Sequence, residues 1–100
     1  MTKDAKEFAA KYLEDFKKRM HITYDEDDNL LRLLASSVAA VAKLVGATAY
    51  DETLVELTFE RAMCAFNDAL DEFKTLYAEE IEDLYLTNMI VASEEAKDDS

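Results

Sequence analysis

This chain has 100 residues, of which 23 are acidic and 11 basic, so its formal net charge is −12. Half of the residues are hydrophobic, yet there is no proline, one glycine and one cysteine. These numbers exclude an internal disulfide, disfavour specific binding to nucleic-acid phosphates and leave too few turn residues for a sheet. We therefore expect a soluble, intracellular, helical protein with no segment that spans a membrane.

The first predicted helix covers residues 3–20, where apolar residues recur with helical periodicity. Its apolar face comprises Phe8, Tyr12, Leu13, Phe16 and Met20. The β-branched and aromatic residues at 22–24 end this pattern. Thr23 and Glu26 have the spacing of a capping box for the next helix, and Asp25 is the alternative cap.

The second predicted helix covers residues 26–45, and Gly46 can end it in a left-handed conformation. Its apolar face comprises Leu30, Leu31, Leu34, Val38, Val41, Ala42 and Val45. The opposite face carries small residues between two basic ones: Arg32, Ser36, Ala39, Ala40 and Lys43. Small residues permit close approach of another helix.

The third predicted helix covers residues 51–77, with Asp51 as its cap. Its apolar arc is about twice as wide as an ordinary surface helix requires, and its polar side carries Glu56, Glu60, Asn67 and Asp71. Glu80 then falls inside the apolar arc, which indicates a bend or break near residues 77–80. Beyond it the apolar set points elsewhere and comprises Ile81, Leu84, Tyr85, Met89 and Ile90.

The predicted fold is all-α, a small bundle of three to four helices with a long third helix that bends or breaks. Residues 1–92 form the single helical domain, and residues 93–100 form an acidic, disordered tail. The centre of the core is predicted to comprise Leu34, Val38, Val41, Phe59, Phe66, Leu70 and Phe73.

No motif in the sequence predicts catalysis, a cofactor or a metal site, so an enzyme is not expected. Residues 25–36 begin like a calcium-binding loop, but Leu30 and Ser36 stand where that loop needs glycine and glutamate. His21 has no second ligand at zinc-binding spacing. Cys64 has no neighbour in sequence that marks it as a nucleophile.

Instead, the excess of apolar surface predicts contacts with other molecules, including other copies of the chain. The basic, small-residue face could receive the acidic face of a neighbour; the alternative is that both faces are solvated. The candidate interface comprises Arg32, Ser36, Ala40, Lys43, Glu56, Glu60, Asn67, Asp71, Ile81, Leu84, Tyr85, Met89 and Ile90.

Four segments together resemble the small head–tail connector proteins of long-tailed bacteriophages, also called adaptor or DNA-packaging proteins, of the type found with Gram-positive hosts. These segments are FKKRMHI at 16–22, DEDDNLLRLLASS at 25–37, LTFER at 57–61 and FNDALDEF at 66–73. The resemblance spans roughly residues 12–82 and is weaker at both ends of the chain.

The resemblance implies a structural protein of the virion that assembles in the host cytoplasm. It implies a ring of about twelve copies beneath the portal protein, with the tail or a head-completion protein on its other side. DNA would pass through this ring without being bound specifically. The main alternative is an acidic helical protein that mimics DNA or inhibits a nucleic-acid enzyme; another is a small binding module that inserts a helix into a groove.

Overall fold

The computed structural model describes residues 3–98, with the side chains of residues 4–93, and all regular elements in that part are helical. The five α-helices are α1 (Lys3–Met20), α2 (Asp27–Leu44), α3 (Val55–Phe66), α4 (Phe73–Leu76) and α5 (Ala78–Asp98). Short 3-10 helices, η1 (Glu52–Leu54) and η2 (Leu70–Glu72), precede α3 and α4. The predicted all-α fold is confirmed, and α1 and α2 lie within one residue of their predicted bounds.

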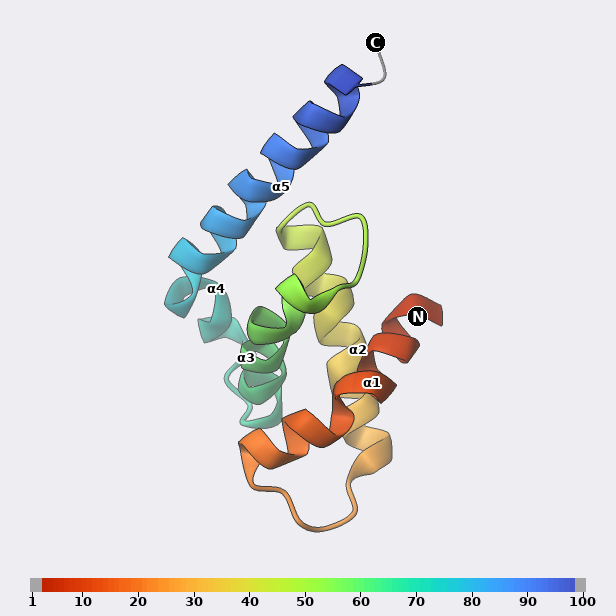
Figure 1. Ribbon diagram of the computed structural model, residues 1–100. Coiled ribbons are helices and arrows are strands. Elements are labelled where there is room, and N and C mark those ends of the chain that lie inside the picture. Colours follow the sequence, from red (N-terminus) through yellow and green to blue (C-terminus); the bar gives the residue numbers. More distant parts are fainter. Residues whose placement is uncertain (1–2, 99–100) are drawn as a thin grey trace.

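Helices α1, α2 and α3 pack together into the body of the molecule, and α5 extends from that body as an arm (Figure 1). The arm makes the molecule elongated, with extents of 53 × 28 × 21 Å. Helix α5 continues to Asp98, so the boundary expected at residue 93 does not coincide with a helix end. The disorder expected for residues 93–100 stays a prediction, and residues 99 and 100 lie outside the described part.

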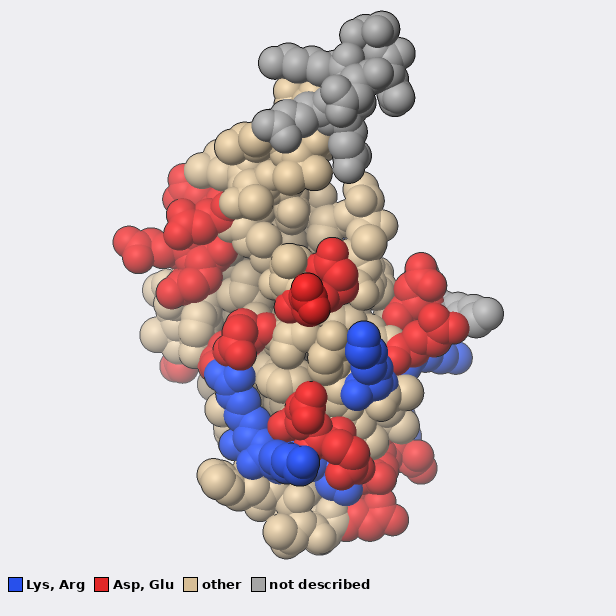
Figure 2. Space-filling view, in the orientation of Figure 1, with Lys and Arg blue, Asp and Glu red and all other residues tan. Residues whose placement is uncertain are grey.

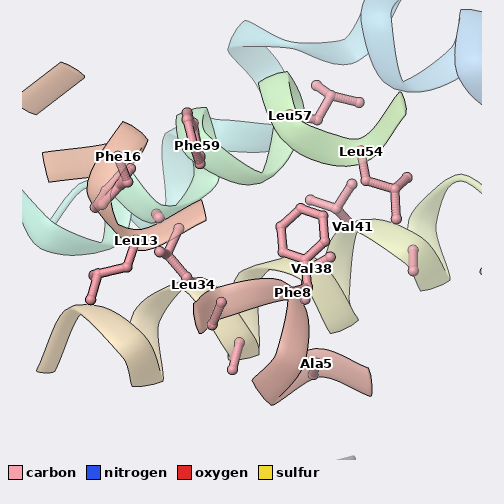
Figure 3. Packing of buried hydrophobic residues seen from close by; sticks show 14 of the residues in the cluster. Ala5, Phe8, Leu13, Phe16, Leu34, Val38, Val41, Leu54, Leu57 and Phe59 are labelled. Carbon is pink, nitrogen blue, oxygen red and sulfur yellow. The ribbon is translucent and has the colours of Figure 1, made fainter. Parts of the chain in front are cut away.

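The core lies between α1, α2 and α3, where apolar side chains from all three helices gather (Figure 3). The rings of Phe16 and Phe59 pack with their centroids 5.2 Å apart. Five of the predicted core residues are buried: Leu34, Val38, Val41, Phe59 and Phe73. The prediction is wrong for the other two, because Phe66 is partly exposed and Leu70 is 42% exposed.

The predicted continuous third helix is wrong, because α3 ends at Phe66 and residues 67–69 are not helical. A second interruption, at Tyr77, is the break that the sequence predicts near residues 77–80. In an unbroken helix Arg61 and Phe73 would be separated by about 18 Å along the axis. Here both side chains line one groove beside α2, because the turn at 67–69 folds the chain back. That return buries Phe73 in the core.

Three helices end with one residue in the left-handed region: His21 (φ 58°), Gly46 (φ 64°) and Asp68 (φ 61°). In each case the next N–H donates to the carbonyl oxygen five positions earlier. These bonds are Ile22 to Lys17 at 2.9 Å, Ala47 to Ala42 at 2.9 Å and Ala69 to Cys64 at 2.7 Å. This is the Schellman motif, which satisfies carbonyl groups left free at a helix end. Only the glycine end was expected from the sequence.

The two predicted caps have different outcomes. Asp51 is confirmed, since its carboxylate accepts a hydrogen bond from the Thr53 N–H at 3.0 Å. The capping box of Thr23 and Glu26 does not form, because Glu26 itself is the N-cap residue and makes no side-chain cap bond. The Asp25 carboxylate instead accepts from the Asp27 N–H at 3.3 Å.

Candidate interaction surfaces

The small-residue face of α2 lies on the surface, as the sequence predicts. Arg32, Ser36 and Lys43 are exposed, and Ala40 is half-buried. The two cations do not border the same hollow. Arg32 lines a groove between α1 and α2 with Lys6 and Asp28, whereas Lys43 lines a larger groove near the other end of α2. This face is therefore divided between two separate surfaces.

The predicted acidic face is largely occupied within the chain. Arg19 of α1 donates to Glu56 at 2.9 and 3.1 Å and to Glu60 at 2.7 Å. The phenol of Tyr77 donates to the second oxygen of Glu60 at 2.6 Å. These bonds join α1, α3 and the residue before α5, so Glu60 is not free to receive a neighbouring copy.

The same contacts change the pKa values of the partners. The hydrogen bond to Glu60 raises the pKa of Tyr77 to about 12, and burial and the nearby negative charge act in the same direction. The hydrogen bond to Glu56 and the charges of Glu56 and Glu60 raise the pKa of Arg19. The network thus holds a protonated phenol and a guanidinium against two carboxylates.

The other two residues of that predicted face lie beyond the end of α3. Asn67 donates from Nδ2 to the Met63 carbonyl at 3.0 Å and so helps to close the helix end. Asp71 is exposed and borders the same groove as Lys43. The structure therefore places one member of the predicted acidic face beside the predicted basic face of the same chain.

The groove that contains Lys43 has a volume of about 790 Å³ and is here called the basic groove. Its lining comprises Ala40, Lys43, Leu44, Arg61, Leu70, Asp71, Phe73 and Lys74. Three cations face one carboxylate around an apolar floor. Arg61 and Lys74 are not predictable from the sequence as members of one site, because only the unexpected turn at 67–69 brings α3 and α4 side by side. The pair Asn67–Asp68 was the available signal, since both residue types tolerate the left-handed conformation.

Arg61 is the most buried of the three cations, and burial lowers its pKa. Its Nη1 donates to the Ser37 hydroxyl at 3.1 Å, a bond that fixes the guanidinium between α2 and α3. Lys43 and Lys74 are exposed, and neither lies within ion-pair distance of a carboxylate in the described part of the chain. Two of the groove's positive charges are thus available to a ligand.

The apolar residues predicted beyond residue 80 lie on two different sides of α5. Ile81 and Leu84 are half-buried against the core. Tyr85 lies beside Gly46, and Asn88 donates to the Val45 carbonyl at 2.8 Å. This side therefore holds the arm against the end of α2.

The other side of α5 is exposed and is here called the outer stripe. It comprises Glu79, Glu82, Asp83, Leu86, Met89 and Ile90. Their spacing of three and four residues places them along one face of the helix. Leu86, Met89 and Ile90 are 49%, 53% and 60% exposed. Figure 2 shows acidic side chains gathered where α5 begins, followed by a surface without charged residues.

Comparison with family models, with curated protein sequences and with solved structures gives no match for this chain. Within residues 3–98 no helix is long and apolar enough to cross a membrane. The described side chains include no group of three or more His, Cys, Asp or Glu residues placed to hold a metal ion.

Proposed function

We propose that this protein is a structural head–tail connector of a long-tailed bacteriophage. In this role, copies of the chain form a ring under the portal protein and offer a docking surface to the tail. The observation that carries the proposal is the outer stripe of α5, where three large apolar side chains are about half exposed on an extended arm. Contiguous exposed apolar surface is characteristic of a protein that binds other molecules.

The charge of the chain supports the same role. A net charge of −12 makes the surface repel phosphate groups, so a channel built from this chain would let DNA slide without holding it. The resemblance of residues 12–82 to connector proteins gives the proposal its specific form.

An acidic DNA mimic is the second candidate, and the same charge is what favours it. A mimic needs carboxylates spaced along an exposed surface like phosphates. Several carboxylates of this chain are instead paired within it, since Arg19 binds Glu56 and Glu60 and Lys17 binds Asp27 at 2.8 Å. These pairs interrupt the acidic surface, and we therefore favour the connector.

The deciding experiment is a mass measurement in solution, followed by negative-stain imaging, of the chain alone and mixed with the portal protein of the same phage. A connector should bind the portal in a ring with many copies. A mimic should remain a monomer or dimer and should instead compete with DNA for a nucleic-acid enzyme. A chain that never associates with a portal would contradict the proposed function.

A further inference from the structure

We propose that the outer stripe of α5 in one copy docks in the basic groove of a second copy. This inference deepens the proposed function, because it names the contact between neighbours on which a ring would rest. It replaces the contact suggested by the sequence, in which Glu56 and Glu60 would meet the α2 face. Those two carboxylates already bind Arg19 in the same chain.

Charge is the first reason for choosing this pair of surfaces. With 23 acidic and 11 basic residues, two copies repel each other in most orientations. A stable contact must therefore place carboxylates of one copy against cations of the next. The basic groove offers Lys43 and Lys74, neither of which has an ion-pair partner among the described side chains of residues 4–93, and Arg61 lines the same groove.

The outer stripe carries the groups that complement this groove. Glu79, Glu82 and Asp83 are exposed at the start of the helix, and none makes an ion pair with a cation in the described residues. The exposed Leu86, Met89 and Ile90 follow along the same face. An acidic and apolar helix face thus fits a groove with a cationic rim and an apolar floor that includes Leu44 and Leu70.

The arm cannot place this stripe in the groove of its own chain. The opposite side of α5 is held by the core contacts of Ile81 and Leu84 and by the Asn88 bond to Val45. The stripe therefore lies opposite the anchoring side, and only Asp83 at its edge borders a hollow shared with Thr53 and Leu57 of the body. Because stripe and groove are different surfaces, the contact between copies is head-to-tail, and repetition gives a ring or an open chain.

Two charge-reversed variants test the contact. The groove variant carries Lys43→Glu and Lys74→Glu, and the stripe variant carries Glu82→Lys and Asp83→Lys. Sedimentation velocity over a concentration series should show oligomers for the parent and a dissociation constant raised about tenfold or more for each variant. Matched controls with the same change of charge on α1, Lys11→Glu with Lys18→Glu and Glu14→Lys with Asp15→Lys, should assemble like the parent.

Mixing the two variants gives the sharper readout, which also shows that both are folded. In the mixture the intact acidic stripe of one variant meets the intact basic groove of the other, and the reversed stripe meets the reversed groove. A head-to-tail contact therefore predicts that each variant alone stays dissociated and that the mixture forms oligomers in which the two variants alternate. The chain with all four substitutions should again form oligomers. A mixture that stays monomeric, or single variants that assemble like the parent, would overturn the contact.

Disulfide trapping tests the contact if copies of the chain associate too weakly for sedimentation to detect oligomers. In a Cys64→Ser background, Lys74→Cys with Glu82→Cys should give a ladder of cross-linked multimers under oxidation. A monomeric parent without such a ladder would also overturn the contact.

Failure of the contact is distinguishable from failure of the function. Rings on a portal that tolerate both variants would refute only the contact, and head-to-tail oligomers that ignore the portal would refute only the function.

Discussion

At the scale of single residues, the least expected feature is Asp68, a non-glycine residue in the left-handed region at the end of α3. A β-carbon makes this conformation costly, and glycine adopts it freely. Gly46 occupies the equivalent position at the end of α2. The two positions therefore allow opposite substitutions at the same type of helix end.

Asp68→Gly should raise the free energy of unfolding by about 0.5–1 kcal/mol, because relief of roughly 1–2 kcal/mol of left-handed strain outweighs the roughly 0.5–1 kcal/mol of extra backbone entropy that glycine loses on folding. Gly46→Ala should lower it by about 1 kcal/mol. The added β-carbon would lie 3.6 Å from the Tyr85 ring, an ordinary contact, so the loss comes from the backbone. Urea denaturation of both variants measures these changes. Equal signs for the two substitutions would contradict the assignment of these helix ends.

Tyr77 should titrate late. The hydrogen bond to Glu60 raises its pKa to about 12 from an ordinary value of 10.0. The fold therefore stabilises the protonated phenol, and this contribution is complete below pH 10 and disappears as the pH rises through 12. Phenolate absorbance should show one component near pH 12 that Tyr77→Phe removes. Loss of that component in Glu60→Gln would support the Glu60 carboxylate as the main cause of the raised pKa. An unchanged titration in Tyr77→Phe would show that the component near pH 12 does not belong to Tyr77.

At the scale of elements, the sequence predicts those parts of the fold that depend on local pattern. Helices α1 and α2 have narrow apolar faces and polar ends, so periodicity locates them within one residue. The wide apolar arc of residues 51–77 predicts one long helix, but it arises from two segments with different partners. Phe59 faces α1, whereas Phe73 reaches the core only after the chain has turned.

The candidate surfaces were predictable to a similar degree. The exposure of Arg32 and Lys43 follows from the pattern of α2, since charged residues opposite a buried face point to solvent. The pairing of Arg19 with Glu56 and Glu60 joins positions 37 and 41 residues apart, and no local pattern encodes it. The basic groove is not encoded locally either, because its lining residues come together only through the chain reversal at residues 67–69.

The corrected path of the chain changes which phenylalanine matters for stability. Phe73→Ala should lower the free energy of unfolding by about 3–5 kcal/mol, as expected for a buried aromatic side chain. Phe66→Ala, the matched substitution at a partly exposed position, should cost less than half as much. Denaturant titration of the two variants compares them directly. A larger loss of unfolding free energy for Phe66→Ala than for Phe73→Ala would instead support the continuous helix that the sequence predicts.

At the scale of the whole molecule, the chain is a packed three-helix body with an arm that is anchored on one side only. Its anchoring side uses Ile81, Leu84 and Asn88, whereas Leu86, Met89 and Ile90 of the outer stripe are about half exposed. The body thus carries the stability, and the arm carries the surface proposed for assembly.

Amide hydrogen exchange should report this division. In the monomeric groove variant, amides of residues 86–91 should exchange faster than those of α2, because fewer buried contacts hold the arm closed. Assembly of the parent should slow exchange at residues 86–91 and at residues 70–74 of the groove together. Protection of the arm alone, without the groove, would indicate a partner surface elsewhere on the neighbouring copy.

The anchoring of the arm also has a consequence for curvature. In a head-to-tail ring, the angle between arm and body sets the rotation from one copy to the next, and a ring of about twelve copies needs about 30° per step. Tyr77, the single non-helical residue between α4 and α5, lies at that joint and is held by Glu60. In the proposed ring this hydrogen bond would fix the angle between arm and body. Tyr77→Phe should then broaden the distribution of copy numbers while leaving the contact between copies intact.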